Sequence, residues 1–377
     1  MQFAISILLF LCINAISIET KSLSNKENDE SYTLSRYRRY IGLGRLYKVN
    51  KKYDACVAPG DVPGHCKHAI FCPVQIVKDP IQFLCVIEGT HVGICCPDDI
   101  ELAKVEGSRV IQNLPASGLD YDEVDTDIGC GLRTMAKPED SSKPAQRWPW
   151  IAALYFKDVN YEQFCGGSLI TDRHVLTAAH CFEGFKAPDI RVRLGEYDFT
   201  KLNETRSKDF LIKEIIVHED YSTLTYENDI AIVVLDKAAN FNSYMWPICL
   251  PPINDKFEGK TAIVAGWGHI SYGGYSSELL LEASIPVWYQ DECVAVFAQR
   301  ITDNVICAAA YEGGVDSCRG DSGGPLLHQL DNGRWVVIGV VSWGIGCGNK
   351  NRPGIYTRVN NYIPWIIKNT TPKYNSG

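Results

Sequence analysis

The sequence predicts an all-β protein of the sandwich or barrel type, preceded by a small segment that disulfides hold together. From Trp150 onward, short β-branched and apolar runs recur between Gly, Pro, Asn and Asp residues, which is typical of many short antiparallel strands. Six of the fifteen cysteines lie between Cys56 and Cys96, in a segment too small to bury a large core unaided. Strands are expected at 151–156, 190–194, 211–217, 230–235, 262–265 and 335–342.

Composition sets the domain organisation and excludes some classes of protein. The 377 residues are enough for two domains. The 46% hydrophobic and 22% charged content argues against wholesale disorder, collagen and coiled coil. A net charge of −8 argues against a protein built mainly to bind nucleic acid. We expect a signal peptide at 1–17, a flexible arm at 18–54, the cysteine-rich segment at 55–97, an acidic linker at 98–136 and the β-rich domain at 137–370.

The two ends of the chain carry further signals. The run from Phe3 to Ile13 is too short to span a bilayer, and small residues up to Ser17 suit a signal peptidase. We therefore expect cleavage after Ser17 and an extracellular protein; a buried strand or a short membrane anchor is the alternative. No later stretch is apolar enough for a membrane span. Near the C-terminus, Ile363 and Ile366 recur at the spacing of a short closing helix.

The cysteines favour disulfides over a metal site. Loss of Cys12 with the signal peptide leaves an even number. The segment has no C-x-x-C pair, and Cys95 directly abuts Cys96, which is poor geometry for one zinc ion. Three disulfides are expected there, with their connectivity left open. Asn203 and Asn369 begin glycosylation sequons that a secreted chain could use.

Three separated motifs together indicate peptide hydrolysis. They contain His180 (Leu176-Thr-Ala-Ala-His-Cys), Asp229 (Tyr226-Glu-Asn-Asp-Ile-Ala) and Ser322 (Asp316-Ser-Cys-Arg-Gly-Asp-Ser-Gly-Gly-Pro). A serine hydroxyl becomes a nucleophile when a histidine takes its proton and an aspartate orients the imidazole. The glycines around Ser322 let the backbone approach the reacting carbonyl, where N–H groups can hold the oxyanion.

On these motifs, residues from about 148 to 368 resemble a trypsin-like peptidase domain of the chymotrypsin family. The six-cysteine segment resembles the clip domain of arthropod cascade proteases, and within that group the chain is most similar to the proclotting-enzyme type. The matching motifs begin at Trp148 (Trp-Pro-Trp), Cys165 (Cys-Gly-Gly-Ser-Leu-Ile), Ala178 (Ala-Ala-His-Cys), Asn228 (Asn-Asp-Ile-Ala), Gly266 (Gly-Trp-Gly), Gly320 (Gly-Asp-Ser-Gly-Gly-Pro-Leu), Val341 (Val-Ser-Trp-Gly) and Pro353 (Pro-Gly-Ile-Tyr-Thr-Arg-Val).

The resemblance implies a chymotrypsin-like double antiparallel β-barrel with a short C-terminal helix and a separate clip domain. It implies His180 as general base, Asp229 as its orienter, Ser322 as nucleophile, and the N–H groups of Gly320 and Ser322 as the oxyanion hole. It also implies seven disulfides: Cys56–Cys95, Cys66–Cys85, Cys72–Cys96, Cys130–Cys249, Cys165–Cys181, Cys293–Cys307 and Cys318–Cys347.

The expected specificity rests on Asp316, which matches the floor of the family's substrate pocket. A carboxylate there attracts the side chain of Lys or Arg and disfavours apolar side chains. Gly344 and Gly354 match the pocket walls, and the run Ser342-Trp343-Gly344 matches the strand that pairs with substrate. A surface-loop carboxylate is the alternative interpretation of Asp316.

The family implies protein substrates, an upstream activating protease and serpin-type inhibitors, with no required cofactor. Glu196 and Glu204 resemble the family's calcium loop. The alternative is that these acidic residues are simply solvated.

The activation segment departs from the family pattern. Related zymogens are cut before Ile/Val-Val-Gly-Gly, and the new terminal ammonium pairs with the aspartate that Asp321 matches. This chain has no such motif, and cleavage between Arg133 and Thr134 is the substitute we consider. The expected function is a secreted serine endopeptidase zymogen that cuts after Arg or Lys in an extracellular cascade of immunity or clotting. A non-catalytic homologue or cofactor, or a variant transcript with a replaced activation exon, are the alternatives.

Overall fold

The computed structural model describes residues 55–67, 80–87, 91–97, 129–133, 148–157, 163–201, 205 and 207–370. Several predictions therefore lie outside the described residues. They are the signal peptide, the arm, most of the linker, Cys72, Thr134, Asn203 and Glu204. Among the helices that the structure describes, none is long and apolar enough to cross a membrane.

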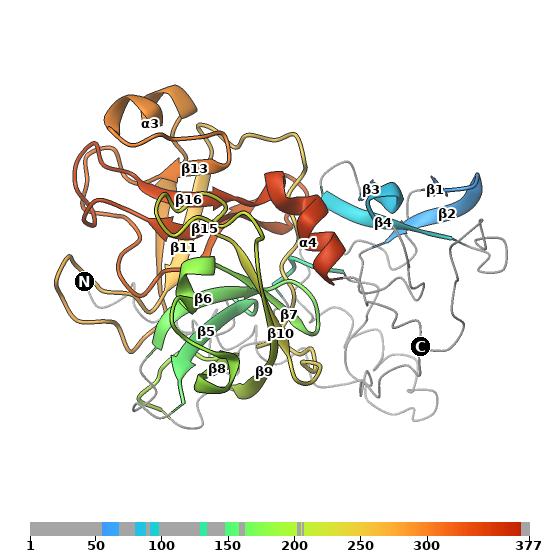
Figure 1. Cartoon of the computed structure of the whole chain (residues 1–377), viewed down its shortest axis with the longest axis horizontal. Coiled ribbons are helices and arrows are strands. Elements are labelled where there is room, and N and C mark those ends of the chain that lie inside the picture. The colour runs from blue at the N-terminus through green and yellow to red at the C-terminus, as the bar shows by residue number, and fades with distance from the viewer. Residues whose placement is uncertain are drawn as a thin grey trace, which may run out of the picture. The chain divides into compact units, whose positions relative to one another are not determined.

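The first half of the β-rich domain is a closed six-stranded antiparallel barrel (Figure 1). Its strands lie side by side in the order β10-β7-β6-β5-β8-β9. In β8 the burial alternates with period two, as expected for a strand with one face on the core. The strand bounds are β5 Ile151–Phe156, β6 Gln163–Leu169, β7 His174–Thr177, β8 Ile190–Leu194, β9 Lys208–Val217 and β10 Ala231–Leu235.

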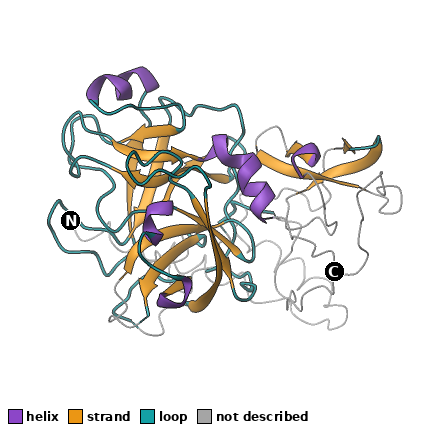
Figure 2. Cartoon of the chain, in the orientation of Figure 1, coloured by secondary structure: helices purple, strands orange, loops and turns teal. Residues whose placement is uncertain are grey.

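The second half is a six-stranded antiparallel sheet in the order β12-β11-β14-β15-β16-β13. In the part of the chain that the structure describes, strands and loops predominate over helices (Figure 2). A β-bridge joins Val287, the residue after β12, to Ala308, the last residue of β13. The two edge strands of the sheet are thus connected at one point, and the sheet curls toward a closed barrel. The prediction of an all-β, double-barrel architecture is therefore confirmed, with the second barrel less completely closed. The bounds are β11 Thr261–Gly266, β12 Leu281–Pro286, β13 Val305–Ala308, β14 Pro325–Gln329, β15 Trp335–Trp343 and β16 Gly354–Arg358.

Two α-helices lie within the residues that the structure describes. Helix α4, Ile363–Thr370, is the predicted closing helix; it follows the 3-10 turn η7, Val359–Tyr362, and buries Ile363, Ile366 and Ile367. Helix α3, Gln290–Val296, was not predicted, and only its Cys293 is buried. Shorter 3-10 turns are η2 Pro80–Phe83, η5 Ala179–Phe182 and η6 Ala187–Asp189.

The cysteine-rich segment forms a four-stranded antiparallel sheet in the order β1-β2-β4-β3. Disulfides join Cys56 to Cys95 and Cys66 to Cys85, the pairs that the clip resemblance implies. Cys96 is also disulfide-bonded, and its implied partner lies outside the described residues. The strands are β1 Ala55–Ala58, β2 Val62–Lys67, β3 Leu84–Ile87 and β4 His91–Pro97.

Residues 129–133, which we expected in the linker, pack on the β-rich domain. The Cys130–Cys249 disulfide anchors them covalently. The N–H of Gly131 donates to the Pro247 carbonyl at 2.8 Å, and its carbonyl accepts from Trp335 N–H at 2.8 Å. The absence of a side chain at Gly131 is necessary, because a Cβ there would lie 2.3 Å from the Trp335 carbonyl oxygen.

Candidate active site

The candidate catalytic residues come from both halves of the β-rich domain. His180 lies on η5, directly after β7, and the Cys165–Cys181 disulfide ties that turn to β6. Asp229 precedes β10 in the same barrel. Ser322 lies on the turn that leads into β14 of the second sheet, and the Cys318–Cys347 disulfide closes the start of that turn.

His180 and Asp229 form a doubly connected pair. The imidazole Nδ1 lies 2.7 Å from Asp229 Oδ2, and the backbone N–H of His180 donates to Asp229 Oδ1 at 3.0 Å. The carboxylate is completely buried, whereas the imidazole keeps 16% of its surface exposed. The Ser342 hydroxyl also donates to Asp229 Oδ2, and Thr357 Oγ1 donates to the Asp229 carbonyl at 2.6 Å. These hydrogen bonds compensate the negative charge of the buried Asp229 carboxylate, which would otherwise be costly to bury.

The turn that carries Ser322 contacts the barrel at Gly166 of β6 and at Thr177, which lies three residues before His180 in sequence. The Ser322 carbonyl accepts from Gly166 N–H of β6 at 2.7 Å. Thr177 Oγ1 donates to the Gly166 carbonyl at 2.7 Å. At Gly323 (φ +75°), a Cβ would lie 2.2 Å from Thr177 Oγ1, so only glycine fits this close approach. The serine turn and the histidine turn therefore share one packed junction.

The same turn presents two unused backbone donors. The N–H groups of Asp321, Gly323 and Gly324 each donate to a carbonyl within the protein. By contrast, those of Gly320 and Ser322 donate to no group among the described residues. Two free N–H groups on either side of Asp321 are the arrangement that an oxyanion hole needs.

The carboxyl group of Asp321 occupies the space that two glycines leave. A Cβ on Gly266 would lie 2.3 Å from Asp321 Oδ1, and one on Gly268 would lie 2.4 Å from its Cγ. Asp321 accepts hydrogen bonds from Gly268 N–H and Cys318 N–H, each at 2.9 Å. Burial raises the pKa of Asp321 to about 6. Among the described residues no Lys or Arg pairs with it, and the His269 side chain opposes the rise in its pKa electrostatically.

A second carboxylate, the half-buried Asp316, lies beside Gly354, which is one of the two glycines expected to form the pocket walls; Gly344, the other, lies next to Gly354. A Cβ on Gly354 would lie 2.8 Å from Asp316 Oδ1, and one on Gly344 would lie 3.9 Å from Gly354 Cα. Asp316 accepts from Ser317 N–H at 2.8 Å and from Gly348 N–H at 3.3 Å. Burial raises its pKa to about 7, with these backbone donors opposing the shift.

Glu196, the described residue of the proposed calcium loop, already has hydrogen-bond and charge partners within the protein. Glu196 accepts from Tyr197 N–H at 2.8 Å through one oxygen and from Arg193 Nη1 at 3.2 Å through the other. Nearby, Asp198 pairs with Lys201 at 2.8 Å. A divalent cation here would have to displace these two side-chain cations, so the described part of this loop does not fit a calcium site.

At the expected cleavage site, Arg133, and the expected glycosylation site, Asn369, the side chains already contact other groups of the protein. The Arg133 guanidinium lies 4.1 Å from the ring centre of Trp148 and 4.4 Å from that of Trp335. Cleavage after Arg133 would require this side chain to leave both rings. Asn369 lies in the last turn of α4, and its Nδ2, the atom that would carry a glycan, donates to the Trp365 carbonyl at 2.9 Å.

Sequence reasoning missed several residues around the site. Thr357 was not singled out, and Ser342 was expected only as part of the substrate strand. Tyr226, in the left-handed region (φ 56°), places its ring 5.8 Å from that of His180. Trp343, which was predicted, stacks edge-on against Phe297 at 5.4 Å. No local pattern signals these contacts, because each joins residues distant in sequence.

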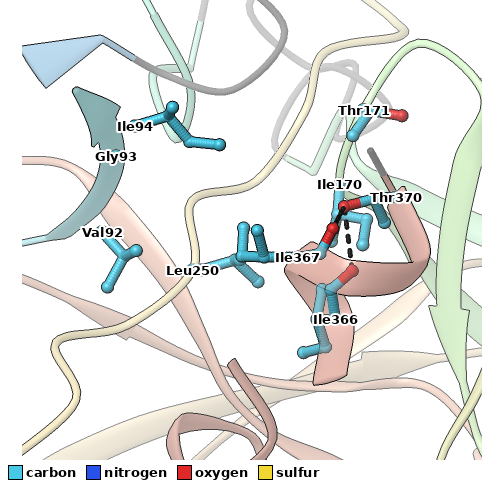
Figure 3. A pocket seen from close by; sticks show the side chains of 9 residues that line it. All are labelled: Val92, Gly93, Ile94, Ile170, Thr171, Leu250, Ile366, Ile367 and Thr370. Carbon is cyan, nitrogen blue, oxygen red and sulfur yellow. Dashed lines mark hydrogen bonds between the residues drawn. The ribbon is translucent and has the colours of Figure 1, made fainter. Parts of the chain in front are cut away.

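The pocket drawn in Figure 3 contains none of the candidate catalytic or specificity residues. Its lining is almost entirely aliphatic and contains no acid, base or thiol. The Thr370 hydroxyl at its edge donates to the Ile366 carbonyl at 2.9 Å. The lining residues are Val92, Gly93, Ile94, Ile170, Thr171, Leu250, Ile366, Ile367 and Thr370.

Comparison with known proteins agrees with this geometry. Residues 139–366 match the Trypsin family model. The chain is 38% identical to serine proteinase stubble of Drosophila melanogaster over 63% of this chain and 32% of that protein. It is 29% identical to the proclotting enzyme of Tachypleus tridentatus over 89% of this chain and 93% of that protein. It is 38% identical to coagulation factor XI of Bos taurus over 59% of this chain and 36% of that protein.

The alignments thus span about a third of stubble and of factor XI, but nearly all of the proclotting enzyme. The last of these covers more of this chain than the peptidase domain alone. The family match covers more than half of the chain. The chain therefore belongs to the trypsin family of serine endopeptidases.

Proposed function

We propose that this chain is a secreted trypsin-like zymogen whose active form cleaves protein substrates after arginine or lysine. The observation that carries this proposal is the enclosed carboxylate of Asp316 beside Gly354. A guanidinium or ammonium entering this slot compensates the carboxylate, whereas an apolar side chain leaves the charge buried and unpaired. Substrates with a basic residue before the scissile bond are therefore favoured.

The proposed reaction uses His180, Asp229 and Ser322. Ser322 Oγ attacks the scissile carbonyl carbon while His180 Nε2 takes the hydroxyl proton. Asp229 holds the proton on Nδ1, which keeps Nε2 as the acceptor and stabilises the imidazolium. The N–H groups of Gly320 and Ser322 stabilise the negative oxygen of the tetrahedral intermediate.

The intermediate then collapses to products. His180 gives its proton to the leaving amine, the peptide bond breaks, and an ester on Ser322 remains. A water molecule, losing a proton to His180, hydrolyses this ester and releases the new carboxylic acid. Ser322 recovers its hydroxyl proton, so one water is consumed for each bond cut.

The wider setting is proposed on chemical grounds and on similarity. Disulfides persist in oxidising, extracellular surroundings, and six are present among the described residues. The long alignment with the proclotting enzyme supports a role in an extracellular cascade. We propose an upstream protease as activator, serpin-type proteins as inhibitors, and Asp321 as the acceptor for a newly formed terminal ammonium.

A panel of peptide amides tests the specificity. The full chain, treated with an activating protease and then N-terminally sequenced, is assayed with Arg, Lys, Phe or Ala before the scissile bond. We expect hydrolysis after Arg and Lys only, and loss of that preference in Asp316→Ser. Asp331→Ser, on an exposed turn, is the matched control. Equal hydrolysis after Phe, or an unchanged preference in Asp316→Ser, would refute the proposal.

A further inference from the structure

We propose that Gln163 is a positioning residue for the oxyanion hole. Its side-chain amide Nε2 donates to the Gly320 carbonyl at 2.9 Å, across 157 positions of sequence. Gln163 begins β6 of the barrel, whereas Gly320 lies on the serine turn of the other sheet. The contact therefore links the first barrel directly to the glycine whose N–H is a donor of the proposed oxyanion hole.

The chemistry of the contact fixes the orientation of the glutamine amide. A carbonyl can only accept, so the Gln163 NH₂ group, and not its oxygen, must face Gly320. Gln163 Oε1 is buried and has no hydrogen-bond partner among the described residues. A buried acceptor without a partner carries a desolvation penalty. The Gln163 side chain thus donates one hydrogen bond, from Nε2 to the Gly320 carbonyl, although its Oε1 is left without a partner in this position.

The peptide group before Gly320 is held by a different contact. The Arg319 carbonyl accepts from His269 N–H at 2.7 Å. Because a trans peptide is planar, its N–H points opposite to its carbonyl. This bond therefore turns the Gly320 N–H away from His269 and leaves it free of any described acceptor.

Gln163 holds the peptide group that follows. The Gly320–Asp321 peptide is fixed at its carbonyl by Gln163 and at its N–H by the Cys318 carbonyl, at 3.0 Å. Gly320 itself has φ +93°, in a region that glycine alone enters readily. With no side chain to restrict it, this glycine relies on its flanking hydrogen bonds to stay in place.

Loss of the Gln163 amide should therefore loosen the oxyanion hole and leave the pocket intact. The Gly320 carbonyl would lose its partner, and rotation about Gly320 would move its N–H away from the oxyanion position. Complete loss of an oxyanion donor costs about 10²–10³-fold in kcat. Loss of one supporting hydrogen bond corresponds to about two- to tenfold, so we expect the effect of Gln163 substitution in the upper part of that smaller range.

The test compares Gln163→Leu and Gln163→Met with wild type in the activated full-length protein. We expect kcat for an Arg-amide to fall about five- to tenfold while KM changes less than about twofold. The dissociation constant of benzamidine, which occupies only the cation pocket, should not change. A peptide argininal, whose adduct with Ser322 places an oxyanion in the hole, should bind about five- to tenfold more weakly.

Gln329→Leu is the matched control, because Gln329 Nε2 also donates to a glycine carbonyl, that of Gly333 at 3.0 Å, on an exposed turn. It should behave as wild type in every assay. A kcat within twofold of wild type in both Gln163 variants would overturn the proposal. So would an equal loss of benzamidine and argininal binding, which would indicate a general structural role for Gln163.

The inference rests on the serine endopeptidase mechanism but not on the preference for Arg or Lys. A fluorophosphonate that modifies serine hydrolases regardless of side-chain specificity separates the two. Its rate of reaction with Ser322 should fall about five- to tenfold in Gln163→Leu. A wild-type protein that reacts with this reagent but ignores Arg-amides would refute the specificity proposal only, and the labelling rates would still decide the role of Gln163.

Discussion

Binding of a basic ligand in the Asp316 pocket should depend strongly on pH near neutrality. Burial raises the pKa of Asp316 to about 7, and only the ionised carboxylate attracts a cation. With this pKa, the Asp316 carboxyl group is ionised in about 90% of the ligand-free molecules at pH 8 and in about 10% at pH 6. The apparent dissociation constant scales inversely with the competent fraction, so benzamidine should bind about tenfold more weakly at pH 6 than at pH 8.

Calorimetric titration with benzamidine at several pH values measures this effect. The amidinium stays charged throughout, so the protein is the source of any change. The His180→Ala variant removes the imidazole of the catalytic pair and should keep the tenfold effect. A dissociation constant within twofold at both pH values would show that Asp316 has an ordinary pKa and that the pocket is open to solvent.

Three other changes test separate parts of the site. Asp229→Asn should lower kcat about 10⁴-fold, because His180 loses the partner that fixes its tautomer; a loss under about tenfold would contradict this role. Gly354→Ala should raise KM for Arg-amides about tenfold or more, because its Cβ would lie 2.8 Å from Asp316 Oδ1; an unchanged KM would mean that the slot lies elsewhere. Arg133→Leu should lower the free energy of unfolding by about 1–3 kcal/mol through loss of two cation–π contacts, measured by urea denaturation, and an unchanged midpoint would argue against them.

The features that sequence reasoning could predict are those that chemistry ties to fixed residue types. Hydrolysis by a serine needs a histidine and an acid, so three short motifs predict His180, Asp229 and Ser322 as the catalytic residues, and the structure pairs the first two. Short β-branched and apolar runs between turn residues indicate strands, and the expected ranges at 151–156 and 190–194 coincide with β5 and β8. Helix α3 was missed because a seven-residue helix with a single buried side chain has almost no apolar period.

The contacts that sequence reasoning could not supply join residues far apart in the chain. The bond from Gln163 to Gly320 spans the two halves of the domain, and nothing near Gln163 in sequence signals its partner. The expectation of a calcium site rested on Glu196 and Glu204 alone, because acidic residues close together in sequence are easy to recognise. It did not anticipate that Arg193, three residues earlier, would bind Glu196.

The central claim is that Ser322 is acylated by substrates whose cationic end occupies the Asp316 pocket. The direct measurement is a burst titration of the activated protein with 4-nitrophenyl 4-guanidinobenzoate, followed by mass mapping of the modified peptide. We predict a burst of nitrophenol equal to the active protein, with the guanidinobenzoyl group on Ser322, and no burst in Ser322→Ala or Asp316→Ser. A label on another residue, or an equal burst in Asp316→Ser, would contradict this account.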